Sequence, residues 1–372
     1  MSAPQGLRAL SFPFTVWLVT RGVLLFGAWV GLLVEPHLHQ ASSMQEPYRA
    51  APLFEAWCRW DCAWYYEIAK GGYANGPQTN FFPLLPILTR ALGFVTRIPP
   101  QWAILIVSNV ATLGAYAVLF RMFRRLSDEQ GARWGLMLFA VYPFAFFHAT
   151  GFPESLMVLL SALAMDYALR GQHFRAGLAL AVGVLSRHIT LLAGAGLLVA
   201  QLQQRPSLGR FLKSPAWLAL ALPWLSLLGY CLYQHFVWGN FLAFYEARAL
   251  WGPLAYWGLG DHFRAPSWSA DIHLKVITTY LPFAAVMLTG VLLSTRNRSW
   301  WPVAAFGLAL SVMLLSVGLW GLGRYSASCW PAFLSLGVLA ARRPTLGMLL
   351  LSGFAVFQGL FYYLHIHQFP VM

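Results

Sequence analysis

Apolar stretches of about 20 residues recur along the whole chain and are separated by short polar segments. A helix needs about this many apolar residues to cross a bilayer, so the pattern predicts an all-α, polytopic integral membrane protein. We expect about 11 transmembrane or broken helices. Their predicted ranges are 11–34, 102–120, 134–148, 155–169, 176–186, 188–200, 215–236, 276–293, 301–317, 329–341 and 345–364.

The stretch 176–200 carries Ser186, Arg187 and His188 in its middle. If it were one span, the basic loop 201–213 would lie on the opposite side from the other basic loops. Two short broken segments, or a re-entrant pair, restore a consistent topology. Discontinuous helices are tolerated at membrane depth where they line a cavity. We therefore prefer two segments, with a single span as the alternative.

The composition excludes a water-soluble globular protein. The chain of 372 residues is 59% hydrophobic and 10% charged, whereas soluble proteins carry about 25% charged residues. Its net charge of +13 does not indicate nucleic-acid binding, because most basic residues lie in short loops between apolar runs, as the positive-inside rule describes.

The charge distribution also predicts the topology. Most acidic residues fall on the side opposite the more basic loops, and we expect that side to be extracytoplasmic. It carries two long loops, 35–101 and 237–275. With no soluble domain or internal repeat, residues 1–372 are predicted to form a single transmembrane domain.

The first of these loops contains the most informative segment, RWDCAWYYEIAKGGY (Arg59–Tyr73), followed by NFFPLLP (Asn80–Pro86). We expect a helix from Trp60 to Lys70 that lies amphipathically at the membrane interface and ends at two glycines. An acid at a membrane face is costly unless it has a function. Asp61 is therefore predicted to be a catalytic base, and a simple anchor helix is the alternative.

Three later segments carry candidate chemistry. His148 and Glu154 flank a turn in PFAFFHATGFPES, where the alternative to a site role is a helix cap. Arg187 lies in an apolar stretch and is predicted to bind an anionic group, the alternative being a structural pair with Asp166. Arg324 in GLGRY suits phosphate capture, because guanidinium binds phosphate oxygens bidentately.

The cysteines and acids suggest no firm metal site or cofactor. Cys58 and Cys62 are four residues apart, without further zinc ligands at suitable spacing. We expect them to be unpaired thiols, although a spacing of one helical turn would let them approach each other. Dependence on a divalent metal stays open, because Asp61 and Glu154 could share an ion. Arg21, within the first span, is expected to snorkel or to face the bundle.

Several blocks together resemble the phosphatidylinositol-glycan class V mannosyltransferases and their bacterial relatives, which belong to the GT-C superfamily. These blocks are RWDxxWYxxIAxxGY, FFPLxP, an outer ESL turn (Glu154–Leu156), Ser-Arg-His at 186–188, WGNFLAF (Trp238–Phe244) and a late Arg-Tyr pair. The resemblance covers most of the chain in order. At position 188 a histidine replaces the asparagine usual in the family.

The resemblance implies a GT-C fold and an inverting glycosyltransferase. Such enzymes move a sugar, usually mannose, from a polyprenyl-phosphate carrier to an acceptor hydroxyl of a glycolipid or glycan on the non-cytoplasmic side. Asp61 would be the base, and Arg59, Arg187 and Arg324 would bind the donor phosphate. The expected substrate-binding residues are Trp60, Trp64, Tyr65, His148, Glu154, His188, Asn240 and Tyr325.

The short loops indicate a bacterial member in the inner membrane, with its active site on the extracytoplasmic face. The expected partners are the lipid-linked sugar donor, the acceptor and membrane lipids, with no nucleic acid. The alternative functions are a membrane transporter or lipid flippase, and a non-catalytic subunit of a transferase complex. Transporters often contain two related halves, and the sequence shows none.

Overall fold

The computed structural model describes residues 5–34, 52–204, 209, 216–248, 280–317, 321–367 and 371. These residues form helices and turns, and no β-strand occurs among them. The prediction of an all-α protein is confirmed. Parts of both predicted outer loops, at 35–51 and 249–275, lie outside the described residues.

Every range predicted to span the membrane contains a helix. Within the described ranges, five helical stretches combine the length and apolar composition that a membrane span needs, at Leu10–Leu33, Pro100–Leu126, Ala216–Trp238, Arg298–Leu315 and Pro344–Ile366. The helices in the predicted ranges are α1 (Gln5–Val34), α5 (Pro100–Leu126), α6 (Glu129–Ala140), α7 (Glu154–Leu169), α8 (His173–Val184), α9 (Ala193–Gln204), α11 (Ala216–Trp238), α15 (Leu281–Ser294), α16 (Trp301–Val317), α18 (Pro331–Arg342) and α19 (Pro344–Ile366).

The stretch 176–200 is broken, as predicted. Helix α8 ends at Val184, a short 3-10 helix η5 (His188–Leu192) follows, and α9 then begins. The carbonyl oxygen of Gly183 accepts hydrogen bonds from the hydroxyls of Ser186 at 2.6 Å and Thr190 at 3.1 Å. Such side chains compete with the helical hydrogen-bond ladder, which explains why the helix ends here.

The range 134–148 was predicted as one span, and this was wrong in its second half. Helix α6 ends at Ala140, and a turn leads into the 3-10 helix η4 (Ala145–His148). Pro143 disfavours helical backbone at the residue before it. The side-chain amide of Gln358 donates to the freed carbonyl oxygens of Ala140 and Tyr142, both at 3.1 Å.

The described chain divides into two compact units. Unit 1 comprises residues 1–72, 85–156 and 337–371, and unit 2 comprises residues 73–84, 157–336 and 372. The prediction of a single domain concerns the whole chain and stays a prediction.

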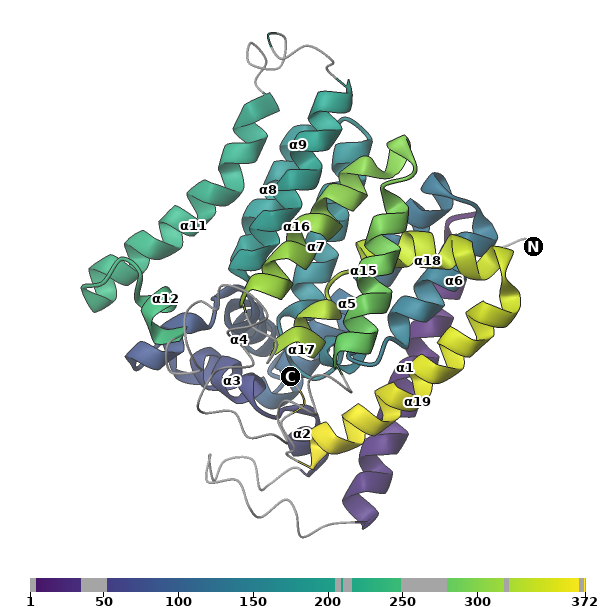
Figure 1. Ribbon diagram of the computed structural model, residues 1–372. Helices are drawn as coiled ribbons and strands as arrows, with labels where there is room; N and C mark the ends of the chain where they lie inside the picture. Colours follow the sequence, from purple (N-terminus) through teal and green to yellow (C-terminus); the bar gives the residue numbers. More distant parts are fainter. Residues whose placement is uncertain are drawn as a thin grey trace, which may run out of the picture. The chain divides into compact units, whose positions relative to one another are not determined.

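In unit 1, α1 packs against α5 and α19 (Figure 1). The indole nitrogen of Trp17 donates to the carbonyl oxygen of Asn109 at 3.0 Å, which joins α1 to α5. Helix α18 crosses α6 at Gly337, where the backbones of the two helices touch at Gly131 and Gly135. Small residues permit such close helix approach in membranes.

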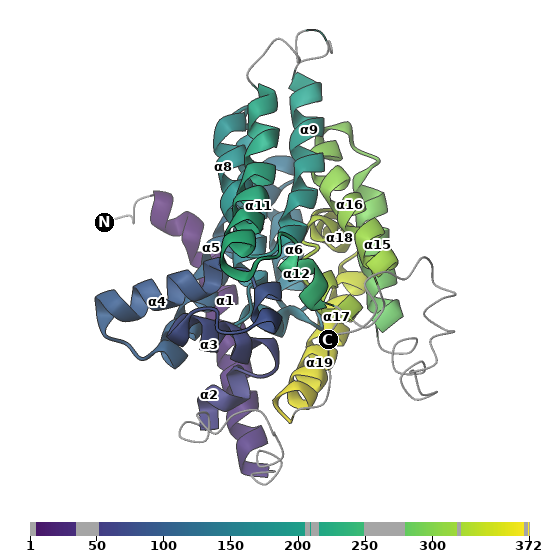
Figure 2. The ribbon, with the colours of Figure 1, turned by 90° about the vertical axis from the view of Figure 1, so that its left-hand side faces the viewer.

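In unit 2, α8, α9 and α11 lie side by side (Figures 1 and 2). Gly177 of α8 lies directly on the backbone of Ala219 in α11, which leaves no room for a larger residue. The short helices α12 (Ala243–Ala247) and α17 (Leu322–Ser326) also belong to this unit.

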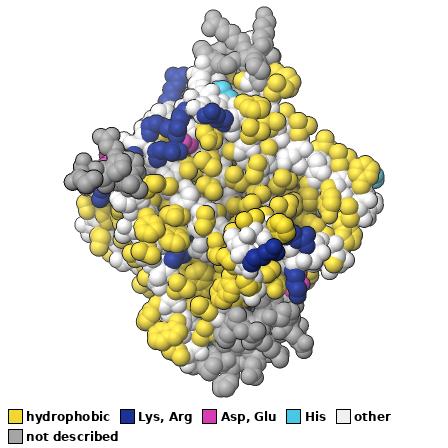
Figure 3. Space-filling view, turned by 180° about the vertical axis from the view of Figure 1, so that it is seen from behind, with side chains coloured by type: hydrophobic (Ala, Val, Ile, Leu, Met, Phe, Trp, Pro, Cys, Tyr) yellow, Lys and Arg dark blue, Asp and Glu magenta, His cyan; other side chains and the backbone are white. Residues whose placement is uncertain are grey.

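Apolar side chains cover much of the face shown in Figure 3. On α1, Phe26 and Trp29 are 62% and 55% exposed, and on α19 Val356 is 68% exposed. Exposed apolar patches of this extent fit contact with lipid chains. Together with the candidate spans, they define a multi-pass membrane protein.

The first loop forms short helices, as predicted. They are α2 (Pro52–Trp57), α3 (Asp61–Gly71), the 3-10 helix η3 (Gly76–Asn80) and α4 (Leu84–Thr96). Gly72 ends α3 with a left-handed φ of 84°. The guanidinium of Arg90 in α4 donates to the carbonyl oxygens of Ala69 and Lys70, both at 3.0 Å, and so caps the last turn of α3.

Candidate functional site

The segment Arg59–Cys62 forms a tight turn in unit 1. The backbone N–H of Cys62 donates to the carbonyl oxygen of Arg59 at 3.1 Å. The turn makes Asp61 the first residue of α3, where the helix dipole favours negative charge. Asp61 is half-buried, and Arg59 is 7% exposed. The predicted base and one predicted phosphate ligand are therefore two residues apart on a single turn.

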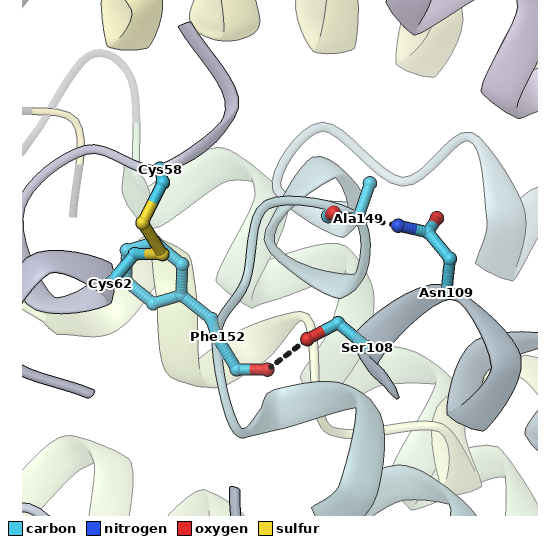
Figure 4. Close-up of a disulfide and its surroundings, with 6 residues drawn as sticks. All are labelled: Cys58, Cys62, Ser108, Asn109, Ala149 and Phe152. Atoms are coloured by element: carbon cyan, nitrogen blue, oxygen red, sulfur yellow. Dashed lines mark hydrogen bonds between the residues drawn. A yellow bond between two sulfur atoms is a disulfide. The ribbon is translucent and has the colours of Figure 1, made fainter. Parts of the chain in front are cut away.

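Cys58 and Cys62 form a disulfide, so the expectation of unpaired thiols was wrong (Figure 4). That expectation came from the apolar setting of the two cysteines and the lack of further zinc ligands at suitable spacing. Because α3 begins only at Asp61, the preceding turn brings the two Cα atoms to 5.1 Å, within the normal range for a disulfide.

The disulfide brings the first-loop segment against the turn that carries His148 and Glu154. A Cβ atom at Gly151 would lie 2.5 Å from the sulfur of Cys62. His148 and Glu154 are 1% and 0% exposed, and Glu154 begins α7. Two segments about 90 residues apart, both predicted to belong to the site, thus meet within unit 1. We call the four candidate residues that these two segments carry, Arg59, Asp61, His148 and Glu154, the acid cluster; the observed contact joins their segments through Cys62 and Gly151.

The aromatic residues predicted to bind substrate differ in exposure. Trp60 and Trp64 are half-buried, whereas Tyr65 is 3% exposed. His148 packs against Phe139, with ring centroids 5.2 Å apart. Trp60 and Trp64 retain accessible surface for a ligand, while Tyr65 contributes mainly to the packing of α3.

A second group of predicted residues lies in unit 2. Arg187 donates from Nη2 to the hydroxyl of Tyr325 at 3.1 Å, and its guanidinium carbon lies 4.7 Å from the centre of the tyrosine ring. Arg324 is the preceding residue on α17 and is 4% exposed. The structure thus joins two predicted segments that are 138 residues apart. We call Arg187, Arg324 and Tyr325 the arginine–tyrosine cluster.

His188 joins three further predicted segments in unit 2. Its ring lies 5.4 Å from Phe82 of NFFPLLP and 5.8 Å from Phe244 of WGNFLAF. The backbone N–H of Leu84 also donates to the carbonyl oxygen of Leu185 at 2.8 Å. His188 therefore occupies an aromatic setting directly beside the arginine–tyrosine cluster.

Sequence reasoning missed Gln234 and Tyr230 on α11. Gln234 is 0% exposed; its amide donates to the carbonyl oxygen of Thr79 at 3.1 Å and accepts from the N–H of Phe244 at 3.0 Å. Tyr230 donates to the same Thr79 oxygen at 2.8 Å. A buried amide one helical turn from a tyrosine in an apolar helix was the available signal.

The environments of Asn240, Asp166 and Arg21 are also defined. Asn240 donates to the Glu246 carboxylate at 2.7 Å, so it shapes the local turn. Asp166 forms an ion pair with Arg170, one helical turn away. Arg21 faces the bundle, is 5% exposed and interacts with Tyr116 and Tyr362.

Neither unit contains, within the described ranges, a group of three or more His, Cys, Asp or Glu side chains that could hold a metal ion.

The described residues form an all-α, multi-pass membrane protein with short helices in its first loop, an arrangement consistent with the GT-C class of membrane glycosyltransferases. The family model described as Mannosyltransferase (PIG-V) matches residues 23–247. The chain belongs to this family, and the resemblance found in the sequence is confirmed. The match includes the acid cluster, Arg187 and His188, and it ends before Tyr325.

Solved structures with a similar arrangement include the Archaeoglobus fulgidus oligosaccharyltransferase tethered with an acceptor peptide, at 12% identity and a TM-score of 0.48. That match covers 94% of this chain and 55% of the other. The same enzyme in complex with Zn and sulfate matches at 12% identity and a TM-score of 0.45, over 94% and 53% of the two chains. This chain therefore spans little more than half the length of these structures. No curated protein matches the chain.

Proposed function

We propose that this chain is an inverting mannosyltransferase that moves mannose from a polyprenyl-phosphate donor to an acceptor hydroxyl of a glycolipid or glycan. The observation that carries the proposal is Asp61, a half-buried carboxylate at the start of α3, within the part of the chain that the mannosyltransferase family model matches. A carboxylate can take the proton of an acceptor hydroxyl that lies within hydrogen-bond reach.

Asp61 would act as the general base. In a single displacement, the acceptor oxygen forms a bond to C1 of the sugar while the bond from C1 to the phosphate oxygen breaks. The electron pair of that bond leaves with the polyprenyl phosphate, and the acceptor proton moves to Asp61. A positioned base of this kind contributes about 10²–10⁴ to the rate. Trp60 and Trp64 are suited to stack against the sugar rings.

The arginine–tyrosine cluster would hold the donor phosphate. The leaving phosphate gains charge as the bond breaks, and guanidinium groups stabilise such charge strongly in a site that excludes water. Arg324 is 4% exposed, so its charge is little screened by solvent. The proposal thus assigns proton abstraction to Asp61 and phosphate binding to Arg187 and Arg324, with Arg59 as a further phosphate ligand.

The disulfide supports an active site on the extracytoplasmic side. Disulfides persist in oxidising compartments such as the bacterial periplasm and are rare in the cytosol. Cys58 and Cys62 flank the proposed base, so the base belongs to the same compartment as the disulfide. The charge distribution of the loops supports the same orientation.

The proposal is tested with purified protein, radiolabelled polyprenyl-phosphate sugars and a lipid extract of the host membrane, with and without a chelator. We expect transfer of mannose by the wild type and nearly complete loss in Asp61→Asn, with expression retained. Glu129→Gln is the matched control, because Glu129 is an exposed acid of unit 1 that pairs with Arg124 and Arg133 on the surface. Normal turnover in Asp61→Asn would end the assignment of the base.

The phosphate assignment has a separate test. Arg324→Ala is expected to weaken binding of the donor lipid, measured with a non-transferable donor analogue. Arg298→Ala is the control, since Arg298 is an exposed cation of unit 2 that stacks on Trp301. If both variants bind the analogue as the wild type does, the arginine–tyrosine cluster does not bind the donor. Transport of lipid without sugar transfer would instead favour a flippase.

A further inference from the structure

The backbone at Trp60 has an unusual conformation. Its φ of 53° and ψ of −123° are those of the first central residue in a type II′ turn, a position that normally requires glycine. A residue with a side chain is strained in this conformation, and it persists only when its surroundings hold it in place. Trp60 directly precedes Asp61, so the conformation of Trp60 sets the direction in which α3 begins.

The Cys58–Cys62 disulfide closes a small loop around this residue. Only Arg59, Trp60 and Asp61 lie between the two cysteines. The loop is also closed by hydrogen bonds, from the N–H of Cys62 to the oxygen of Arg59 at 3.1 Å and from Ala63 to Trp60 at 3.0 Å. A covalent ring of this size leaves the enclosed backbone few other conformations.

The disulfide also packs against a turn of unit 1 that hydrogen bonds hold in place. Gly151 has a φ of 72°, and a Cβ atom there would lie 2.5 Å from the sulfur of Cys62. On either side of this glycine, Asn109 donates to the carbonyl oxygen of Ala149 at 3.0 Å and Ser108 to that of Phe152 at 3.4 Å (Figure 4). Hydrogen bonds from α5 therefore fix the turn that contains Gly151, and the sulfur of Cys62 packs against this turn.

We propose that Cys58, Cys62 and Gly151 are positioning residues for Asp61. The disulfide holds Trp60 in its left-handed conformation. The sulfur of Cys62 also packs against Gly151, whose turn is hydrogen-bonded to α5, so the start of α3 is fixed relative to α5. The carboxylate of Asp61 therefore keeps one position in unit 1. This inference rests on the proposed role of Asp61 as the base. Catalysis is sensitive to such positioning, because a displacement of about 1 Å at a reacting group can cost about 100-fold in rate.

The first test removes the disulfide in Cys58→Ser/Cys62→Ser, in detergent, with polyprenyl-phosphate mannose and the host lipid extract. We expect kcat to fall about 100-fold, while KM for the donor changes less than threefold. A merely stabilising disulfide would lower the thermal midpoint and leave kcat of the folded protein unchanged. A kcat within threefold of the wild type, in protein that remains monodisperse, would overturn the proposal.

The second test starts from folded wild-type protein, in case the double variant does not fold. Purified wild-type protein is reduced with a phosphine and alkylated, and mass spectrometry verifies the modification at positions 58 and 62. Gly151→Ala is tested in parallel, with Gly359→Ala as control, because a Cβ at Gly359 meets nothing within 4 Å. We expect the alkylated protein and Gly151→Ala both to have a lower kcat than the wild type, and an unchanged kcat in both would refute the positioning role.

The third test measures coupling between the disulfide and Trp60. Glycine adopts positive φ freely, so in a Trp60→Gly background the backbone has no strain to release when the disulfide is removed. The loss of kcat caused by Cys58→Ser/Cys62→Ser should therefore be at least fivefold smaller in that background than in the wild type. Equal losses would show that the disulfide does not act through Trp60.

The outcomes separate this inference from the proposed function. If Asp61→Asn turns over normally, Asp61 is not the base and the proposed function fails at its first step. If Asp61→Asn is inactive and the cysteine variants keep the wild-type kcat, the base assignment stands and only the positioning role is lost.

Discussion

The contact between α18 and α6 allows a sharp prediction about the stability of unit 1. In Gly337→Ala, the new Cβ would lie 2.5 Å from the backbone nitrogen of Gly135 and 2.6 Å from its Cα, and it would also meet the carbonyl oxygen of Gly131. All of these atoms belong to the backbone, so no side chain can turn away. Ordinary van der Waals contact begins at 3.4 Å, so the two helices would have to separate by at least about 0.9 Å.

Overpacking of this kind costs about 1–3 kcal/mol. For a unit of this size, 1 kcal/mol corresponds to about 2–4 °C in the thermal midpoint. We therefore expect Gly337→Ala to lower the apparent midpoint by about 2–12 °C, measured in detergent by the loss of monodisperse protein on size exclusion after heating.

The matched control is Gly353→Ala in α19, where a new Cβ meets nothing within 4 Å. Alanine is favoured over glycine in a helix by about 1 kcal/mol, so the control should be as stable as the wild type or more stable. Equal midpoints for the two variants would refute the close packing of α18 on α6.

Three further predictions concern single side chains. Tyr325→Phe removes the hydrogen bond to Arg187 but keeps the ring beneath the guanidinium of Arg187, whereas Tyr325→Leu loses both. Donor binding should therefore weaken less in Tyr325→Phe than in Tyr325→Leu. Equal effects in a titration with the donor analogue would show that the ring contributes nothing. Gln234→Leu removes two buried hydrogen bonds, one to the carbonyl oxygen of Thr79 and one from the N–H of Phe244. It should therefore lower the thermal midpoint by an amount equivalent to about 2–4 kcal/mol. Arg21→Met removes a buried cation that has no acidic partner among the described residues and should raise the midpoint; a lower midpoint would show that the tyrosines around Arg21 more than repay its desolvation.

The sequence predicted the helices well because the membrane restricts the alternatives. Apolar backbone in lipid must satisfy its hydrogen bonds internally, so an apolar run of sufficient length becomes a helix. The break near Arg187 was also predictable, since a cation in the middle of an apolar stretch and the sidedness of the basic loops both argued against one span. The end of α6 was missed because Pro143 acts on the residue before it, and hydropathy does not register that effect.

The candidate residues were chosen from the sequence, whereas the contacts that the fold makes between them could not be predicted from it. Asp61 and Arg187 were found because charge is expensive beside or within a membrane. The disulfide was missed because it depends on a turn at Trp60 whose left-handed backbone no local preference of tryptophan indicates. The contact from Arg187 to Tyr325 is set by the packing of unit 2 over 138 residues of separation, and no local pattern specifies it.

The hydrogen bond between Arg187 and Tyr325 has a consequence for the residues that relatives of this chain should carry at these two positions. Arg187 lies inside the segment matched by the family model, and Tyr325 lies outside it, because that segment ends at residue 247. Substitutions at the two positions should be correlated through evolution, with an aromatic hydroxyl retained wherever the arginine is retained. Sequence comparisons that stop at the end of the matched segment would leave this co-varying pair unseen.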